Sequence, residues 1–193
     1  MHLNTRYPLV CILLLSLVIS ACKKEVIRTY SLPKQSITVA SLKPQQSLSW
    51  HIPDTWIKKD NTQFRKASYS IPHHSSTHKD LIADFSISSF PGDAGGLTQN
   101  INRWRSQLAL TGLSDTDAKN SLSTVEHEHL NIQLVTLDSD KKLLLDSYYK
   151  SSYVAIFDFD DQRYFIKLSG EKNHLNRIKA DFMNLLSEHL HVD

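Results

Sequence analysis

The segment 91–105 contains the residues best suited to bind a ligand. Three glycines fall within five positions there, and glycine permits the left-handed backbone of a tight turn. An apolar periodicity begins directly after them, so backbone N–H groups at a helix start would face an anion. The candidate ligand-binding residues are Gly92, Asp93, Gly95, Gly96, Asn100 and Arg103. The competing interpretation is a packed turn, with Asp93 capping backbone amides and Trp104 in the core.

Histidines form two clusters that raise the question of a metal site. His73, His74 and His78 share one polar loop, while His127 and His129 alternate along a predicted strand and would share a face. No His-Glu-x-x-His motif accompanies them, and no cysteine lies near either cluster. We therefore predict no metal ligands and no cofactor.

Aspartates gather at two predicted turns, around Asp138 and Asp140 and around Asp158, Asp160 and Asp161. Turns favour Asp because its side chain bonds to nearby backbone. The glycine and distant glutamate of a calcium loop are missing, and no Gly-x-Ser-x-Gly elbow is present. The sequence therefore predicts no catalytic residues, and an enzymatic role stays open only as an alternative.

The N-terminal segment points to another chemistry, the acylation of a thiol. After Arg6, an apolar run at 9–19 is too short to span a bilayer, which takes about 20 residues. The run ends in ISAC (19–22), which resembles the lipobox of bacterial lipoproteins. That resemblance implies that the chain is cut before Cys22, which is acylated on its sulfur and its new amino group. The alternative is an ordinary secretory signal followed by a chance cysteine.

The chain is expected to divide into a signal peptide (1–21), a lipidated tether (22–46) and a single domain (47–193). The tether is polar and contains an expected entry strand at 37–42. Cys11 and Cys22 are the two cysteines, so the domain relies on its core rather than on disulfides. A net charge of +2 gives no reason to expect nucleic-acid binding.

Hydrophobic periodicity predicts strands alternating with two helices. A helix begins at Leu97 and ends near Gly112, and a second follows Lys172 with Leu175 and Phe182 on its apolar face. A loop is expected at 113–123. The expected strands lie at 64–71 and 81–90, within 124–137, at 142–149, and in a hairpin of 153–159 with 163–168. This order predicts an α+β fold, an antiparallel sheet with flanking helices.

Three stretches resemble known families. WHIPDTW (50–56) resembles the W-x-x-P-x-x-W entry of the PsbP-like/Mog-like superfamily, and YFIKLSG (164–170) resembles its final strand. That superfamily includes small bacterial lipoproteins of the DcrB type. PGDAGGL (91–97) and the helix after it resemble a set of bacterial extracytoplasmic proteins. The resemblance implies an α-β-α sandwich but no single activity, because fold does not fix function. The Lys-rich tether and shortened loops depart from the pattern, so partner surfaces do not carry over.

Two functions from different classes follow. The first is a membrane-tethered extracytoplasmic lipoprotein, lipid-anchored in the cell envelope and facing the periplasm or exterior. It would act as a non-catalytic binding or assembly module, with the membrane as one partner through Cys22 and an envelope protein as another. The alternative is a carrier or enzyme that binds a small anionic ligand at the Gly92–Arg103 loop and helix.

Overall fold

The computed structural model describes residues 46–62, 64–73, 82–139 and 150–193. These residues belong to one compact unit, Pro44–Asp193. The predicted signal peptide, the tether up to residue 45, and the strands expected at 37–42 and 142–149 lie outside them. No helix in the described ranges combines the length and apolar character needed to cross a membrane.

The main sheet of the described residues has seven strands in the order β2-β3-β4-β8-β7-β6-β5, and every neighbouring pair is antiparallel. Its strands are β2 (Ile57–Lys58), β3 (Arg65–Pro72), β4 (Ile82–Pro91), β5 (Leu122–Val125), β6 (Ile132–Asp138), β7 (Lys150–Phe159) and β8 (Gln162–Glu171). The helices are α2 (Leu97–Gln107), α3 (Asp115–Asn120) and α4 (Lys172–Glu188). The predicted α+β fold, the 153–168 hairpin and the helix after Lys172 are confirmed.

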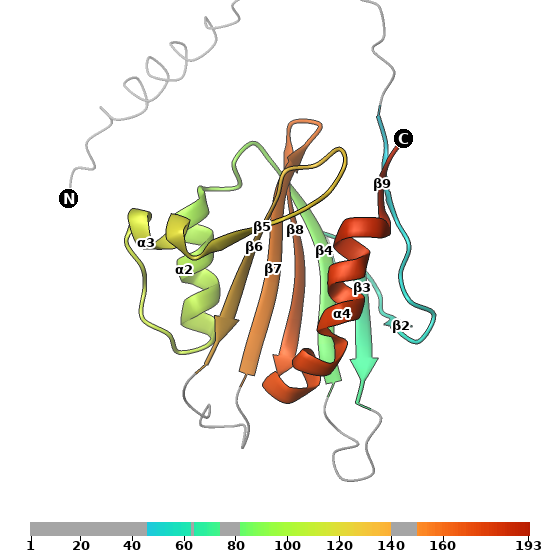
Figure 1. Ribbon diagram of the computed structural model, residues 1–193, viewed down its shortest axis with the longest axis horizontal. Helices are drawn as coiled ribbons and strands as arrows, with labels where there is room; N and C mark the ends of the chain where they lie inside the picture. The colour runs from blue at the N-terminus through green and yellow to red at the C-terminus, as the bar shows by residue number, and fades with distance from the viewer. Residues whose placement is uncertain (1–45, 63, 74–81, 140–149) are drawn as a thin grey trace, which may run out of the picture. The chain divides into compact units, whose positions relative to one another are not determined.

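Helices lie on both sides of this sheet, α4 on one and α2 with α3 on the other (Figure 1). The period-two pattern of the central strands requires both layers, because alternate residues point to opposite faces. On β7, Tyr153 and Phe157 join the cluster beneath α4, while Val154 and Ile156 join the cluster beneath α2. The arrangement is an α-β-α sandwich.

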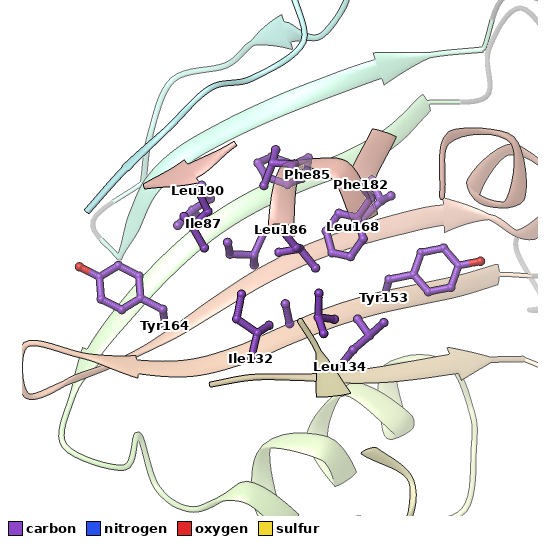
Figure 2. Close-up of a cluster of buried hydrophobic side chains, with 14 of the residues drawn as sticks. Phe85, Ile87, Ile132, Leu134, Tyr153, Tyr164, Leu168, Phe182, Leu186 and Leu190 are labelled. Atoms are coloured by element: carbon purple, nitrogen blue, oxygen red, sulfur yellow. The ribbon is translucent and has the colours of Figure 1, made fainter. Parts of the chain in front are cut away.

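The larger core cluster lies beneath α4 and is drawn in Figure 2. The apolar face of α4 predicted from the sequence is buried there, with Phe182 fully inaccessible to solvent. Glu171 caps the helix by accepting hydrogen bonds from the backbone N–H groups of Asn173 (2.9 Å) and His174 (2.7 Å). The acid at this helix start thus satisfies donors that have no partner within the helix.

The smaller core cluster lies beneath α2. Ile101, Trp104 and Leu108 recur on one helix face and pack on the apolar residues of β6, β7 and β8. This helix ends at Gln107 rather than near Gly112, because Ala109 adopts a positive φ of 56° and breaks the helical path. The buried strand residues in the cluster beneath α2 come from β6, β7 and β8, whereas the same face of β3 and β4 carries the polar residues Ser68, Asp84 and Ser86.

Two local predictions between 113 and 137 are wrong. The expected loop contains α3, which begins after Ser114, whose Oγ accepts a hydrogen bond from the Asp117 N–H. The strand expected within 124–137 is present as β6, but β5, which pairs with it, was not predicted. The strand pattern expected for His127 and His129 is wrong. These two histidines lie in the connection between β5 and β6 and not on a strand face.

A second, two-stranded sheet joins the beginning and the end of the described residues. Here β1 (Leu48–Trp50) pairs antiparallel with β9 (Leu190–Val192). The backbones of Ser47 and Asp193 extend the pairing, exchanging hydrogen bonds of 3.0 and 2.9 Å. The sequence pattern did not indicate this pairing.

Candidate functional site

The glycine-rich segment forms a tight turn between β4 and α2. The left-handed backbone expected of this turn is present at Gly95 and Gly96, whose φ values are 86° and 89°. Gly92 also has a positive φ of 61°. Gly96 combines its φ with a ψ of 150°, a region that is essentially restricted to glycine.

The polar groups of this turn bond to one another. Asp93 Oδ1 accepts a hydrogen bond of 3.0 Å from the Gly95 N–H. The Asn100 side chain is buried and donates to the carbonyl oxygens of Ala94 (3.0 Å) and Gly96 (2.7 Å). The packed-turn interpretation therefore describes the geometry, with Asp93 capping a backbone amide and Asn100 bracing the loop. An anion at this turn stays a prediction.

The hollow beside the turn has the wrong charge for an anion. Its lining is Gly92, Asp93, Asp158, Phe159, Asp160, Asp161, Gln162 and Arg163. Arg163 already binds Asp158 through two N–H···O contacts of 2.8 Å. The hydrogen bonds from Arg163 lower the pKa of Asp158, and the Asp158 carboxylate raises the pKa of Arg163. With its guanidinium paired and three further carboxylates beside it, the hollow repels negative ligands.

Arg103 does not lie with the other candidate residues at the turn. Its guanidinium carbon lies 5.9 Å from the centre of the Trp104 ring, within cation–π range. The positive charge of Arg103 lowers the pKa of Lys167 on β8. Lys167 in turn donates a 2.9 Å hydrogen bond to the side chain of Gln107, which lies on α2 like Arg103. Arg103 therefore belongs to a second group of charges, beside α2 over the middle of the sheet.

This second group lies on the α2 side of the sheet, on β3, β4 and β8 and at Lys59 just after β2. We call it the basic half-face, defined by Lys59, Arg65, Ser68, Asp84, Ser86, Arg103 and Lys167. One row of it starts at Lys59 and crosses three strands. The Lys59 N–H bonds to the Ser68 carbonyl oxygen, Ser68 pairs with Ser86, and Ser86 pairs with Lys167. Paired residues share a face, so cations flank two hydroxyl groups.

Charges on the basic half-face are unbalanced, with four cations and one carboxylate. Lys59 and Arg65 both bind Asp84, the latter at 3.4 Å, and Arg65 also lies 3.4 Å from the Ser68 hydroxyl. Burial is the main cause of the lowered pKa of Lys167. The Asp84 carboxylate opposes this lowering, whereas the positive charges of Arg103 and Arg65 add to it. Loss of water and the two nearby guanidinium groups both make the charged form of Lys167 less stable. The basic half-face therefore carries more positive charge than its neighbours stabilise.

Sequence reasoning missed the basic half-face, except for Arg103. Its residues come from three strands, from helix α2 and from Lys59 just after β2, and no motif spacing links them. The available signal was the polar side of the β4 pattern, where Asp84 and Ser86 alternate with buried apolar residues. A strand that is apolar on one face and polar on the other indicates a face without a helix over it.

The histidines do not form a metal site in the described part of the chain. The Nδ1 of His127 accepts from the N–H groups of His129 and Leu130, both at 3.1 Å. Its proton is therefore on Nε2, which donates to the Leu190 carbonyl oxygen at 2.9 Å. His127 thus fixes the β5–β6 connection to the segment before β9. No group of three metal-binding side chains occurs among the described residues, which exclude His74 and His78.

A Gly96→Ala change should lower the free energy of unfolding by more than about 1 kcal/mol. A new Cβ at Gly96 would meet no atom within 4 Å, so the loss would come from backbone conformation alone. Gly112→Ala is the matched control, because its Cβ would make only ordinary contact with Asn102, at 3.6 Å. Urea denaturation measures both, and equal midpoints for the two variants would contradict the prediction.

Comparisons with known proteins identify no family. No protein-family model matches the chain, and no curated protein matches it. A solved structure from Bacteroides thetaiotaomicron has 14% identity and a TM-score of 0.45, covering 76% of this chain and 45% of its own. The chain thus spans less than half of that protein. LpqN, described as involved in cell envelope biogenesis of Mycobacterium tuberculosis, has 10% identity and a TM-score of 0.45, covering 79% of this chain and 87% of its own. The PsbP-like/Mog-like resemblance stays a prediction.

Proposed function

We propose that this protein is a lipid-anchored component of a bacterial cell envelope that acts as a non-catalytic binding module. The anchor is the lipid on Cys22, the residues up to 46 are the tether, and the domain faces the periplasm or exterior. The sequence ISAC (19–22) supports the anchor, since a small-residue site after a short apolar run precedes the cysteine. Two or more acyl chains hold a protein stably on a membrane, where one is marginal.

The observation that carries the binding role is the basic half-face. A sheet face normally buries its residues beneath a helix or another sheet. Here Ser68 and Ser86 lie at 1% and 6% exposure beside Lys59, Arg65 and Lys167, which are only half-buried. Cations that remain accessible above buried hydroxyl groups suit an anionic binding partner.

The anchor is tested by a Cys22→Ser change in cells labelled with a fatty acid. Label on the protein should fall to background, and the domain should leave the membrane fraction, because serine has no thiol to receive the acyl chain. Cys11→Ser is the matched control and should keep its label, since Cys11 lies in the signal peptide. Equal labelling of the Cys22→Ser variant and the unchanged chain would refute the lipobox interpretation.

A further inference from the structure

We propose that the basic half-face binds a phosphoryl group between Lys59, Arg65 and Lys167. This inference rests on the proposed binding role and specifies the class of ligand. Guanidinium groups match the geometry of phosphoryl oxygens with paired N–H donors, while ammonium groups act as point charges. The basic half-face supplies both kinds of cation on neighbouring strands.

The charge balance favours an anion over a neutral polar ligand. The single carboxylate, Asp84, is shared by Lys59 and Arg65. Lys167 instead donates to the uncharged side chain of Gln107. A phosphoryl group carrying more than one negative charge would neutralise the excess and give the ammonium an ionic acceptor.

The two lysines of the row flank the position that we propose for the phosphoryl group. Ser68 and Ser86 face each other across β3 and β4, between the two lysines of the same row. Neighbouring strands are roughly 4.8 Å apart, so the backbones of Lys59 and Lys167 are separated by about 14 Å. In the structure Lys59 binds Asp84 and Lys167 binds Gln107. The proposed site has both ammonium groups turn from these partners to a phosphoryl group above the row, with the buried Ser68 and Ser86 beneath it.

Apolar side chains on the same strands suggest two sources of the phosphoryl group. The exposed large hydrophobic residues of the described chain are Ile57, Phe64 and Ile82, each more than half accessible. By strand register, Ile57 shares its face with Ser70 and Asp84, and Phe64 stacks on Phe90 at 5.9 Å. A lipid headgroup and a soluble phosphate share the required chemistry, and the apolar groups would contact only an acyl chain.

The test is titration calorimetry on the full chain in dodecyl maltoside micelles at constant ionic strength. One arm adds pyrophosphate, and the other adds phosphatidic acid with uncharged diacylglycerol as its reference. At least one phosphoryl probe should bind at about 1 mM or below. Lys167→Gln and Arg65→Gln should each weaken that binding about tenfold, since each removes a charged donor. Pyrophosphate binding identifies a soluble source, and phosphatidic acid binding alone identifies a lipid.

Lys179→Gln is the matched control, because it removes the same charge from α4, where the ammonium lies 5.4 Å from the Tyr153 ring centre on the other side of the sheet. Its affinity should equal that of the unchanged chain. Thermal unfolding first establishes that each variant is folded. Arg103→Gln, at an exposed position, is a further variant that should weaken binding several-fold. The inference is overturned if neither probe binds, or if Lys179→Gln and Lys167→Gln lose the same affinity. Fatty-acid labelling of Cys22 does not depend on phosphoryl binding, so it tests the lipid anchor whatever the calorimetry shows.

Discussion

Replacing Phe182 with alanine is expected to lower the free energy of unfolding by about 3–5 kcal/mol. Its side chain is fully buried at the centre of the cluster beneath α4. The ring lies 6.1 Å from that of Tyr153 and 6.4 Å from that of Phe85, measured between centres (Figure 2). The loss combines the transfer free energy of the ring with the cavity left among neighbours that relax only partly. Urea denaturation followed by circular dichroism measures it.

Phe64→Ala serves as the matched control because it deletes the same ring at a site that is 60% exposed. Its stacking on Phe90 covers one side, so we expect a loss within about 1 kcal/mol. If the Phe182→Ala and Phe64→Ala proteins had the same unfolding midpoint, Phe182 would not be a core residue.

The second large effect is expected from Trp104→Ala, also about 3–5 kcal/mol. Trp104 is the largest side chain of the cluster beneath α2 and packs edge-on against Phe165, with ring centres 5.1 Å apart. Since α2 holds to the sheet mainly through this face, its loss should loosen the helix. Hydrogen exchange of the α2 amides should rise together with the fall in stability.

Trp104→Phe is the conservative control and should recover much of the loss, because a smaller aromatic ring still fills part of the space. A Trp104→Ala variant with unchanged α2 exchange would show that the helix is held by other contacts. Gly112→Ala provides a second reference, since it alters the chain just beyond α2 without removing a buried group.

Local periodicity was sufficient to predict the elements that contain their own pattern. The β7–β8 hairpin alternates around a two-residue turn at Asp160 and Asp161, both with positive φ, and α4 repeats apolar residues at helical spacing. Helix α3 was missed because six residues with one buried side chain, Ala118, have no detectable period. Its signal was the pair Ser114 and Asp117, which bond at the helix start.

The basic half-face could not be predicted because it depends on strand order rather than on spacing. β8 lies between β4 and β7, which brings Lys167 next to Ser86 across a long stretch of intervening chain. Likewise His127 and His129 had the alternation of a strand, but the His127 ring accepts two backbone N–H groups and closes a turn instead. Hydrophobic periodicity does not show where a side chain takes backbone N–H groups that a strand would otherwise use.

The pairing of β1 with β9 has a consequence for the order in which the domain forms during synthesis. Ser49 and Asp193, whose side chains bond at 3.3 Å, are 144 positions apart. Closing so long a loop is entropically costly and requires nearly every intervening residue to have been made. β1 must therefore wait unpaired while the main sheet assembles, and its exposed edge is open to proteases and chaperones until β9 arrives. Among the described strands, β1 is the first to be made and the last to find its partner.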